Sequence, residues 1–205
     1  MGFENVVTFS NFIPIFVILP LTNKMSIGCE EEIEMRDRKN EFFDIVRARS
    51  GENEKALNLL LNERCYALIG AIIRMELDSL IRVYNFNNVD SRKQEQLLNR
   101  FFASGKWPNT DSNMVKSMSR SLGWTEHIYE FCCAFVHLSP YHDWASDDTI
   151  PNLTQDKRHL IVNAIRSQQY DPTLVIDENF GFTDLILFAP HIFNKLRDNL
   201  LYEMR

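Results

Sequence analysis

The amino-acid sequence predicts an all-α protein: a single-domain helical bundle of six to eight helices with almost no strand. Three observations support this fold class. Apolar residues recur three and four positions apart through much of the chain, which is typical of amphipathic helices. Cap and stop residues flank these stretches, as Thr110 and Gly123 do. The 205 residues, 45% hydrophobic and 24% charged, have the composition of an ordinary globular domain.

The first half of the chain is expected to form long helices. One covers residues 29–50 and ends at Gly51. Residues 54–86 form one long helix or two stacked helices, because no proline interrupts their apolar pattern. Residues 85–94 break this pattern, and residues 103–113 are a loop by their content of Gly, Pro, Asn and Asp.

The middle of the chain contains two further predicted helices. The first begins at Thr110 or Asp111 and runs to Leu122, with Gly123 suited to the left-handed turn that stops it. The second has Thr125 as its N-cap and runs to Leu138, where the Ser139–Pro140 pair ends it.

The last part of the chain is expected to be helical at its end. Residues 156–168 have the pattern of a short helix. Thr183 starts another short helix, and Pro190 occupies the first turn of a final helix that ends near Met204.

The N-terminal segment, residues 6–21, is strongly apolar. It is shorter than the roughly 20 residues that a spanning helix needs, and it contains Asn11, Pro14 and Pro20. We therefore expect residues 25–205 to be a single all-helical domain, and residues 1–24 to be an apolar extension that either lies outside the fold, packs against the domain or associates with a membrane. No membrane partner is expected unless residues 6–21 are exposed.

Charge and cysteine content restrict the function classes. The net charge of -6 argues against a broadly basic nucleic-acid binder, although a local basic groove can exist on an acidic protein. The four cysteines include no Cys-x-x-Cys, so neither a disulfide framework nor a zinc site is indicated. Reduced thiols predict a cytoplasmic protein. No glycine-rich phosphate loop or dinucleotide fingerprint is present, so no cofactor is expected.

Two polar features stand out on the predicted helix over residues 65–86. Arg74, Asp78 and Arg82 follow one another at four-residue spacing, a ladder that is ordinarily a solvated face. Glu76 instead projects between apolar residues, where an unpaired carboxylate would cost several kcal/mol. We expect an Arg, a His or several backbone N–H groups opposite Glu76, either as a buried ion pair that docks two helices or as part of a site.

The predicted helix over residues 125–138 is apolar nearly all round, which is typical of a central buried helix. Its remaining polar stripe carries Glu130 and ends at His137, which either titrates in a site near neutral pH or interacts with the helix dipole. Ser139 and His142 would cluster with His137 just beyond the helix. We predict that His137 leaves the interior on the side where Arg74 and Glu76 lie.

Three stretches of the chain carry a family resemblance: "AIIRMELDSLIRVYNF", "IYEFCCAFVHLSPYHDW" and the closing "FGFTDLILFAPHIFNKLRDNLLYEM". Together they resemble HEPN-like all-helical domains and their uncharacterised bacterial relatives over residues 40–204. The resemblance implies a fold of this type, a homodimer, an RNA or protein partner, and a relation to RNA-processing or defence and toxin proteins. Active members are metal-independent ribonucleases. Their motif is an Arg, usually followed by a polar residue, then four to six further residues and a His on the same helix face.

This sequence departs from that family motif. The only segment of the right length, Arg120 to His127, is divided by Gly123 and the Thr125 cap between two predicted helices. If His137 is the functional histidine, Arg74 of another helix must supply the guanidinium. Histidine would then move the 2′-hydroxyl or leaving-group proton, and arginine would stabilise the phosphorane.

The sequence therefore leaves three functions open. The first is a binding or assembly module without catalysis, and the second is the metal-independent endoribonuclease, with Arg74, Glu76, His137 and His142 as catalytic candidates. For both of these functions, Arg120, His127, Glu130 and Ser139 are the candidate binding residues, and no metal ion is expected. The third is an HD-type metal-dependent phosphohydrolase, in which ligands would come from a larger set: His127, His137, His142, Asp143, His159 and Asp184.

Overall fold

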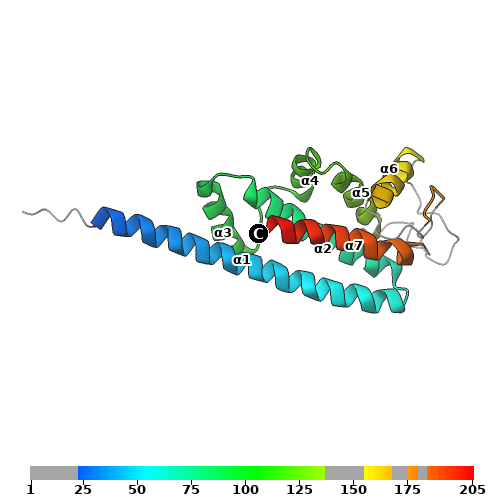
Figure 1. Ribbon diagram of the computed structural model, residues 1–205, viewed down its shortest axis with the longest axis horizontal. Helices are drawn as coiled ribbons and strands as arrows, with labels where there is room; N and C mark the ends of the chain where they lie inside the picture. Colours follow the sequence, from blue (N-terminus) through cyan, green and yellow to red (C-terminus); the bar gives the residue numbers. More distant parts are fainter. Residues whose placement is uncertain (1–22, 137–154, 168–174, 180–183) are drawn as a thin grey trace, which may run out of the picture. The chain divides into compact units, whose positions relative to one another are not determined.

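The computed structural model describes residues 23–136, 155–167, 175–179 and 184–205. These residues contain seven α-helices and no strand (Figure 1). The prediction of an all-α protein with six to eight helices is thus confirmed for this part of the chain. The chain divides into two compact units, residues 1–36 and 37–205, and helices α2 to α7 belong to the second. Among the helices described, none is long and apolar enough to cross a membrane.

Helix α1 spans Asn23–Asn62 and passes through Gly51 without interruption. The prediction that Gly51 ends this helix is wrong, because a glycine within a helix costs only about 1 kcal/mol relative to alanine. The helix ends instead at Asn62, and Arg64 just beyond it has a left-handed φ of 54°. The N–H of Cys65 donates to the carbonyl of Leu60, and that of Arg64 to the carbonyl of Leu61. These two bonds form a Schellman stop without its usual glycine.

Helix α2, Tyr66–Asn87, is the central helix of the unit. It contacts α3, α4, α5 and α7, and Figure 1 shows α7 running alongside it. The apolar residues Ile69, Ile73, Leu77 and Leu80 recur three and four positions apart, which predicts one buried helix face, and all four are buried. The helix predicted over residues 125–138, expected to be a central buried helix, is buried on one face at Ile128, Phe131 and Cys132, whereas Val136 is 49% exposed.

Helices α3, Ser91–Ser104, and α4, Asp111–Ser119, follow the local capping rules closely. Asp90 caps α3 by accepting a hydrogen bond from the N–H of Lys93 at 3.0 Å. Gly105 ends α3 in the left-handed conformation, with φ 65°. Thr110 caps α4 as predicted and accepts from the N–H of Asn113 at 3.4 Å. Helix α4 ends at Ser119, before the predicted stop at Gly123.

Helix α5 spans Trp124–Val136, so it begins one residue before the predicted Thr125 cap. Thr125 lies inside the helix and is fully buried, and its hydroxyl donates to the carbonyl of Leu122 at 2.8 Å. Because α5 already includes Trp124 and Thr125, Thr125 is not the N-cap, and the capping prediction is wrong. Ile128, Phe131 and Cys132 form the buried face of α5.

Helix α6, Gln155–Ser167, confirms the short helix predicted near its residues. Helix α7, Leu185–Glu203, contains Pro190 in its interior, so the predicted division at Pro190 is wrong. Pro190 has no N–H to donate to the carbonyl one turn earlier. Burial of Phe188, Ile192 and Phe193 on the same helix provides a packing interaction that outweighs this lost bond.

An aromatic cluster joins α1, α2 and α3. The Phe42 ring of α1 lies 5.5 Å from that of Phe86, 5.0 Å from that of Phe101 and 6.0 Å from that of Trp107. Because Trp107 comes from the loop after α3, the cluster also fixes the path of the chain between α3 and α4.

Candidate functional site

The predicted site residues fall into three groups in the structure. His137, Ser139 and His142 lie outside the described residues, so their predicted convergence with Arg74 and Glu76 stays a prediction. Glu76 and Arg74 lie on α2 and take part in separate polar contacts. Arg120, His127 and Glu130 lie on or beside α4 and α5.

Glu76 is completely buried between α1 and α2. Its carboxylate accepts a hydrogen bond from the Ser50 hydroxyl at 2.5 Å and another from the Asn53 side-chain amide at 2.8 Å. Neither donor carries a charge, so the expected Arg, His or backbone donors are replaced by two neutral side chains of α1. This enclosure favours the docking role of Glu76 over a role in contact with substrate.

Arg74 belongs to a chain of ion pairs that joins α1, α2 and α4. Its guanidinium is 2.8 Å from Asp111, and Asp111 is also 3.1 Å from Arg82. Arg82 is 2.8 Å from Asp78, which in turn is 3.1 Å from Arg49 of α1. The side chains of Arg74 and Asp78 are only 13% and 14% exposed. The prediction that this ladder is a solvated face is therefore wrong, because α4 covers it.

The environment of Arg74 holds its positive charge firmly. Burial alone would lower the pKa of Arg74, but the charges of Asp111 and Asp78 more than offset this, and the pKa is raised. The guanidinium also lies 4.4 Å from the centre of the Tyr129 ring on α5, a cation–π distance. Arg74 is thus placed against the helix whose chain continues toward His137.

The predicted binding residues near α5 are dispersed. Arg120 is exposed and follows α4, whereas His127 is half-buried within α5. The family-length segment between them is therefore divided between two helices, as predicted. Glu130 lies on the exposed face of α5. In the same helix, burial raises the pKa of the Cys132 thiol far above its ordinary value, which makes that thiol unreactive.

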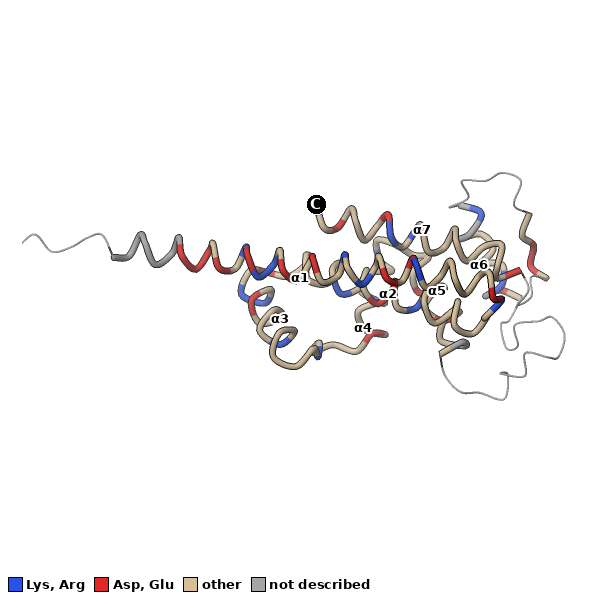
Figure 2. Tube along the Cα trace, turned by 90° about the horizontal axis from the view of Figure 1, so that it is seen from below, with Lys and Arg blue, Asp and Glu red and all other residues tan. Residues whose placement is uncertain are grey.

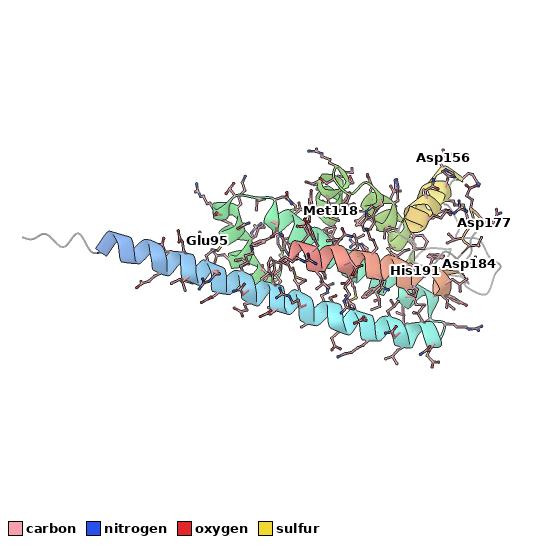
Figure 3. The ribbon with its side chains drawn as sticks, viewed as in Figure 1. Glu95, Met118, Asp156, Asp177, Asp184 and His191 are labelled. Atoms are coloured by element: carbon pink, nitrogen blue, oxygen red, sulfur yellow. The ribbon has the colours of Figure 1, made fainter. Side chains whose placement is uncertain are left out.

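No group of three His, Cys, Asp or Glu side chains among the described residues could hold a metal ion. Asp156, Asp177 and Asp184 lie at the same end of the unit, near α6 and the start of α7 (Figure 3). His159 of α6 contacts Glu178 at 2.5 Å, so its imidazole is engaged there. Of the remaining HD-type candidates, His127 lies on α5, and His137, His142 and Asp143 lie outside the described residues.

The structure contains a pocket that the sequence did not predict. It has a volume of about 450 Å³ and opens between the end of α2, α3, the loop after α3 and the start of α4. Its floor consists of half-buried or buried apolar side chains: Val89, Leu97, Trp107 and Met114. This volume lies in the range of small-molecule sites, which are mostly apolar with a few placed polar groups.

The rim of the pocket is polar and carries no carboxylate. Lys93, Gln96, Asn99, Arg100 and Asn109 line it and are exposed. Within the part of the chain that the structure describes, the side chains of Gln96, Asn99, Arg100 and Asn109 have no polar partner. The indole N–H of Trp107 is buried and also has no acceptor among the described residues.

The local sequence explains how these residues come together. Lys93, Gln96, Leu97 and Arg100 are spaced by three and four positions, so they share one face of α3. Gly105 then turns the chain, and packing of Trp107 on Phe42 holds the loop beside that face. The mixed polar and apolar face of α3 could be recognised from the sequence. The position of Trp107 and Met114 opposite this face could not, because it depends on contacts between distant residues.

Comparison of the chain with protein families, curated proteins and solved structures found no match. The resemblance to HEPN-like domains therefore rests on the three sequence stretches that carry it.

Proposed function

We propose that this protein is a helical binding module, HEPN-like in architecture, and that the pocket between α2, α3 and α4 is its binding site. The observation that carries the proposal is an open apolar floor surrounded by polar side chains without partners. Small-molecule sites are mostly apolar with a few placed polar groups, and exposed polar side chains that have no protein partner remain available to a ligand at such a cavity.

The proposal includes a cellular setting. Cys65, Cys132 and Cys133 are free thiols, which supports a reducing compartment such as the cytoplasm. As the family resemblance implies, we propose a homodimer with an RNA or protein partner, related to bacterial RNA-processing or defence and toxin systems. In this scheme the pocket acts in recognition and not in bond cleavage.

The pocket can be tested with two small probes, 1-decanol and decanoate. Their binding should shift the side-chain amide NMR signals of Asn85, Asn99 and Asn109, which line the cavity. Leu97→Trp fills the floor and should abolish these shifts, because the indole occupies the space of the probe. Ser91→Trp is the matched control, since Ser91 is exposed on α3 outside the pocket.

Failure of both probes to shift these amides in the wild-type protein would overturn the proposal. Shifts that persist unchanged in Leu97→Trp would also overturn it, because the probes would then bind elsewhere.

A metal-independent endoribonuclease is the second candidate. It is favoured by the position of Arg74 against Tyr129 of α5, the helix that precedes His137. RNA cleavage in EDTA that is lost in His137→Ala and in Arg74→Gln would support it. Cleavage that survives both substitutions, or none in the wild-type protein, would exclude this site.

A further inference from the structure

We infer that the pocket selects an amphipathic organic anion, with an apolar body on the floor and a carboxylate or similar monoanion held by Arg100. This inference rests on the proposed binding function and specifies its ligand class. The charges around the cavity, and the pairing of each charged group, support it.

Two cations line the pocket, and they are not equivalent. The ammonium of Lys93 is 3.2 Å from the carboxylate of Asp90, which partly neutralises it. Arg100 has no carboxylate partner among the described residues, and it is exposed at the rim. A guanidinium can donate two parallel hydrogen bonds to one carboxylate, so Arg100 is suited to hold an anionic group.

The acidic groups on the neighbouring elements do not oppose an anion. Asp90 and Asp111, at the starts of α3 and α4, are each held in ion pairs. Glu95 lies on α3 but does not line the pocket. Figure 2 marks the Lys and Arg positions along α3, in a chain whose net charge is -6. The positive rim is thus a local feature that the overall charge does not produce.

The apolar floor of the pocket determines which body the anionic ligand carries. Val89, Leu97, Trp107 and Met114 offer apolar surface, and removing this surface and a hydrocarbon body from water favours binding. The rim amides of Gln96, Asn99 and Asn109 can hydrogen-bond polar atoms near the entrance. A ligand with a hydrophobic body and one terminal negative charge uses all of these groups.

The experiment compares, near pH 7, three probes with linear ten-carbon chains and different head groups: decanoate, 1-decanol and decyltrimethylammonium. Decanoate should bind about tenfold more tightly than 1-decanol, because a charge-assisted hydrogen bond contributes more than a neutral one. The cationic probe should bind most weakly. Added salt should weaken decanoate binding and leave 1-decanol binding unchanged.

Arg100→Gln should reduce decanoate affinity about tenfold and change 1-decanol affinity by less than about twofold. Arg92→Gln removes the same charge from the exposed surface of α3 outside the pocket, so it should leave both affinities unchanged. Isothermal titration calorimetry of the full chain measures all of these values.

The outcomes separate the two proposals. Equal binding of decanoate and 1-decanol, or no effect of Arg100→Gln, overturns the anion inference while the pocket remains a binding site. Failure of every probe to bind overturns the proposed function itself. Loss of decanoate binding in both Arg100→Gln and Arg92→Gln would show general electrostatic attraction and would also overturn the assignment to Arg100.

Discussion

The Glu76 site between α1 and α2 and the pocket between α2, α3 and α4 differ in how their polar atoms are satisfied. Glu76 is fully buried, and its carboxylate has two donors from α1. The rim of the pocket is exposed and carries four side chains that lack partners within the described residues. Buried and paired polar groups hold helices together, whereas open and unpaired ones remain available to a ligand.

The largest effect is expected from Glu76→Leu. This change leaves the Ser50 hydroxyl and the Asn53 amide buried without an acceptor, and it should lower the free energy of unfolding by about 3 kcal/mol. Urea denaturation followed by circular dichroism measures the difference.

Two further variants sharpen this result. The triple change of Ser50→Ala, Asn53→Leu and Glu76→Leu should recover part of the loss, because no buried donor remains unpaired. Glu52→Gln, on the exposed face of α1, should stay within about 0.5 kcal/mol of the wild type. A Glu76→Leu protein as stable as Glu52→Gln would contradict the docking role of Glu76.

The Asp111 ion pairs are expected to give an intermediate effect. Asp111→Asn removes the partner of Arg74 and one partner of Arg82, and these groups are 36%, 13% and 22% exposed. Because solvent reaches part of the network, the loss should be about 1 to 2 kcal/mol, less than for a fully buried pair.

The salt dependence of stability tests whether the stability lost in Asp111→Asn is electrostatic. Raising the ionic strength should reduce the difference between Asp111→Asn and the wild type. Asp44→Asn breaks an exposed pair with Arg47 on α1 and should cost less than about 0.5 kcal/mol. A cost for Asp111→Asn no larger than that of Asp44→Asn would show that the network does not join α2 to α4.

The fold class and most helices could be predicted because they depend on local patterns. The apolar spacing of Ile69, Ile73 and Leu77 was sufficient to identify the buried face of α2. Gly51 and Pro190 were misleading, since packing kept both residues inside helices. The stop at Arg64 carried no glycine and therefore left no sequence signal.

The polar sites were predicted less completely because their partners come from distant segments. The need of Glu76 for a partner followed from its position among apolar residues, but Ser50 and Asn53 lie more than twenty residues earlier. Asp78 and Arg82 were expected to be solvated because no local pattern shows that α4 covers them. The pocket depends on the position of Trp107 against Phe42, which only the folded chain sets.

The smallest effect is expected from the pair of His159 and Glu178, whose side chains are both accessible to solvent. The hydrogen bond from His159 lowers the pKa of the Glu178 carboxyl in the folded protein. Its contribution to stability is therefore present above the ordinary carboxyl pKa and is lost as the pH falls through the lowered value. The side chains are 56% and 36% exposed, so the effect on the unfolding temperature at pH 7 should be too small to detect.

His159→Ala should nevertheless raise the pKa of Glu178 toward its ordinary value, and an NMR titration of the Glu178 side chain measures this directly. Gln155→Ala, which removes a hydrogen bond of 3.1 Å to the same carboxylate, should raise it less. An unchanged pKa in His159→Ala would show that the contact does not persist in solution. This pair stabilises the fold less than the Glu76 contacts do because it is open to solvent, and water competes for each hydrogen bond that it can reach.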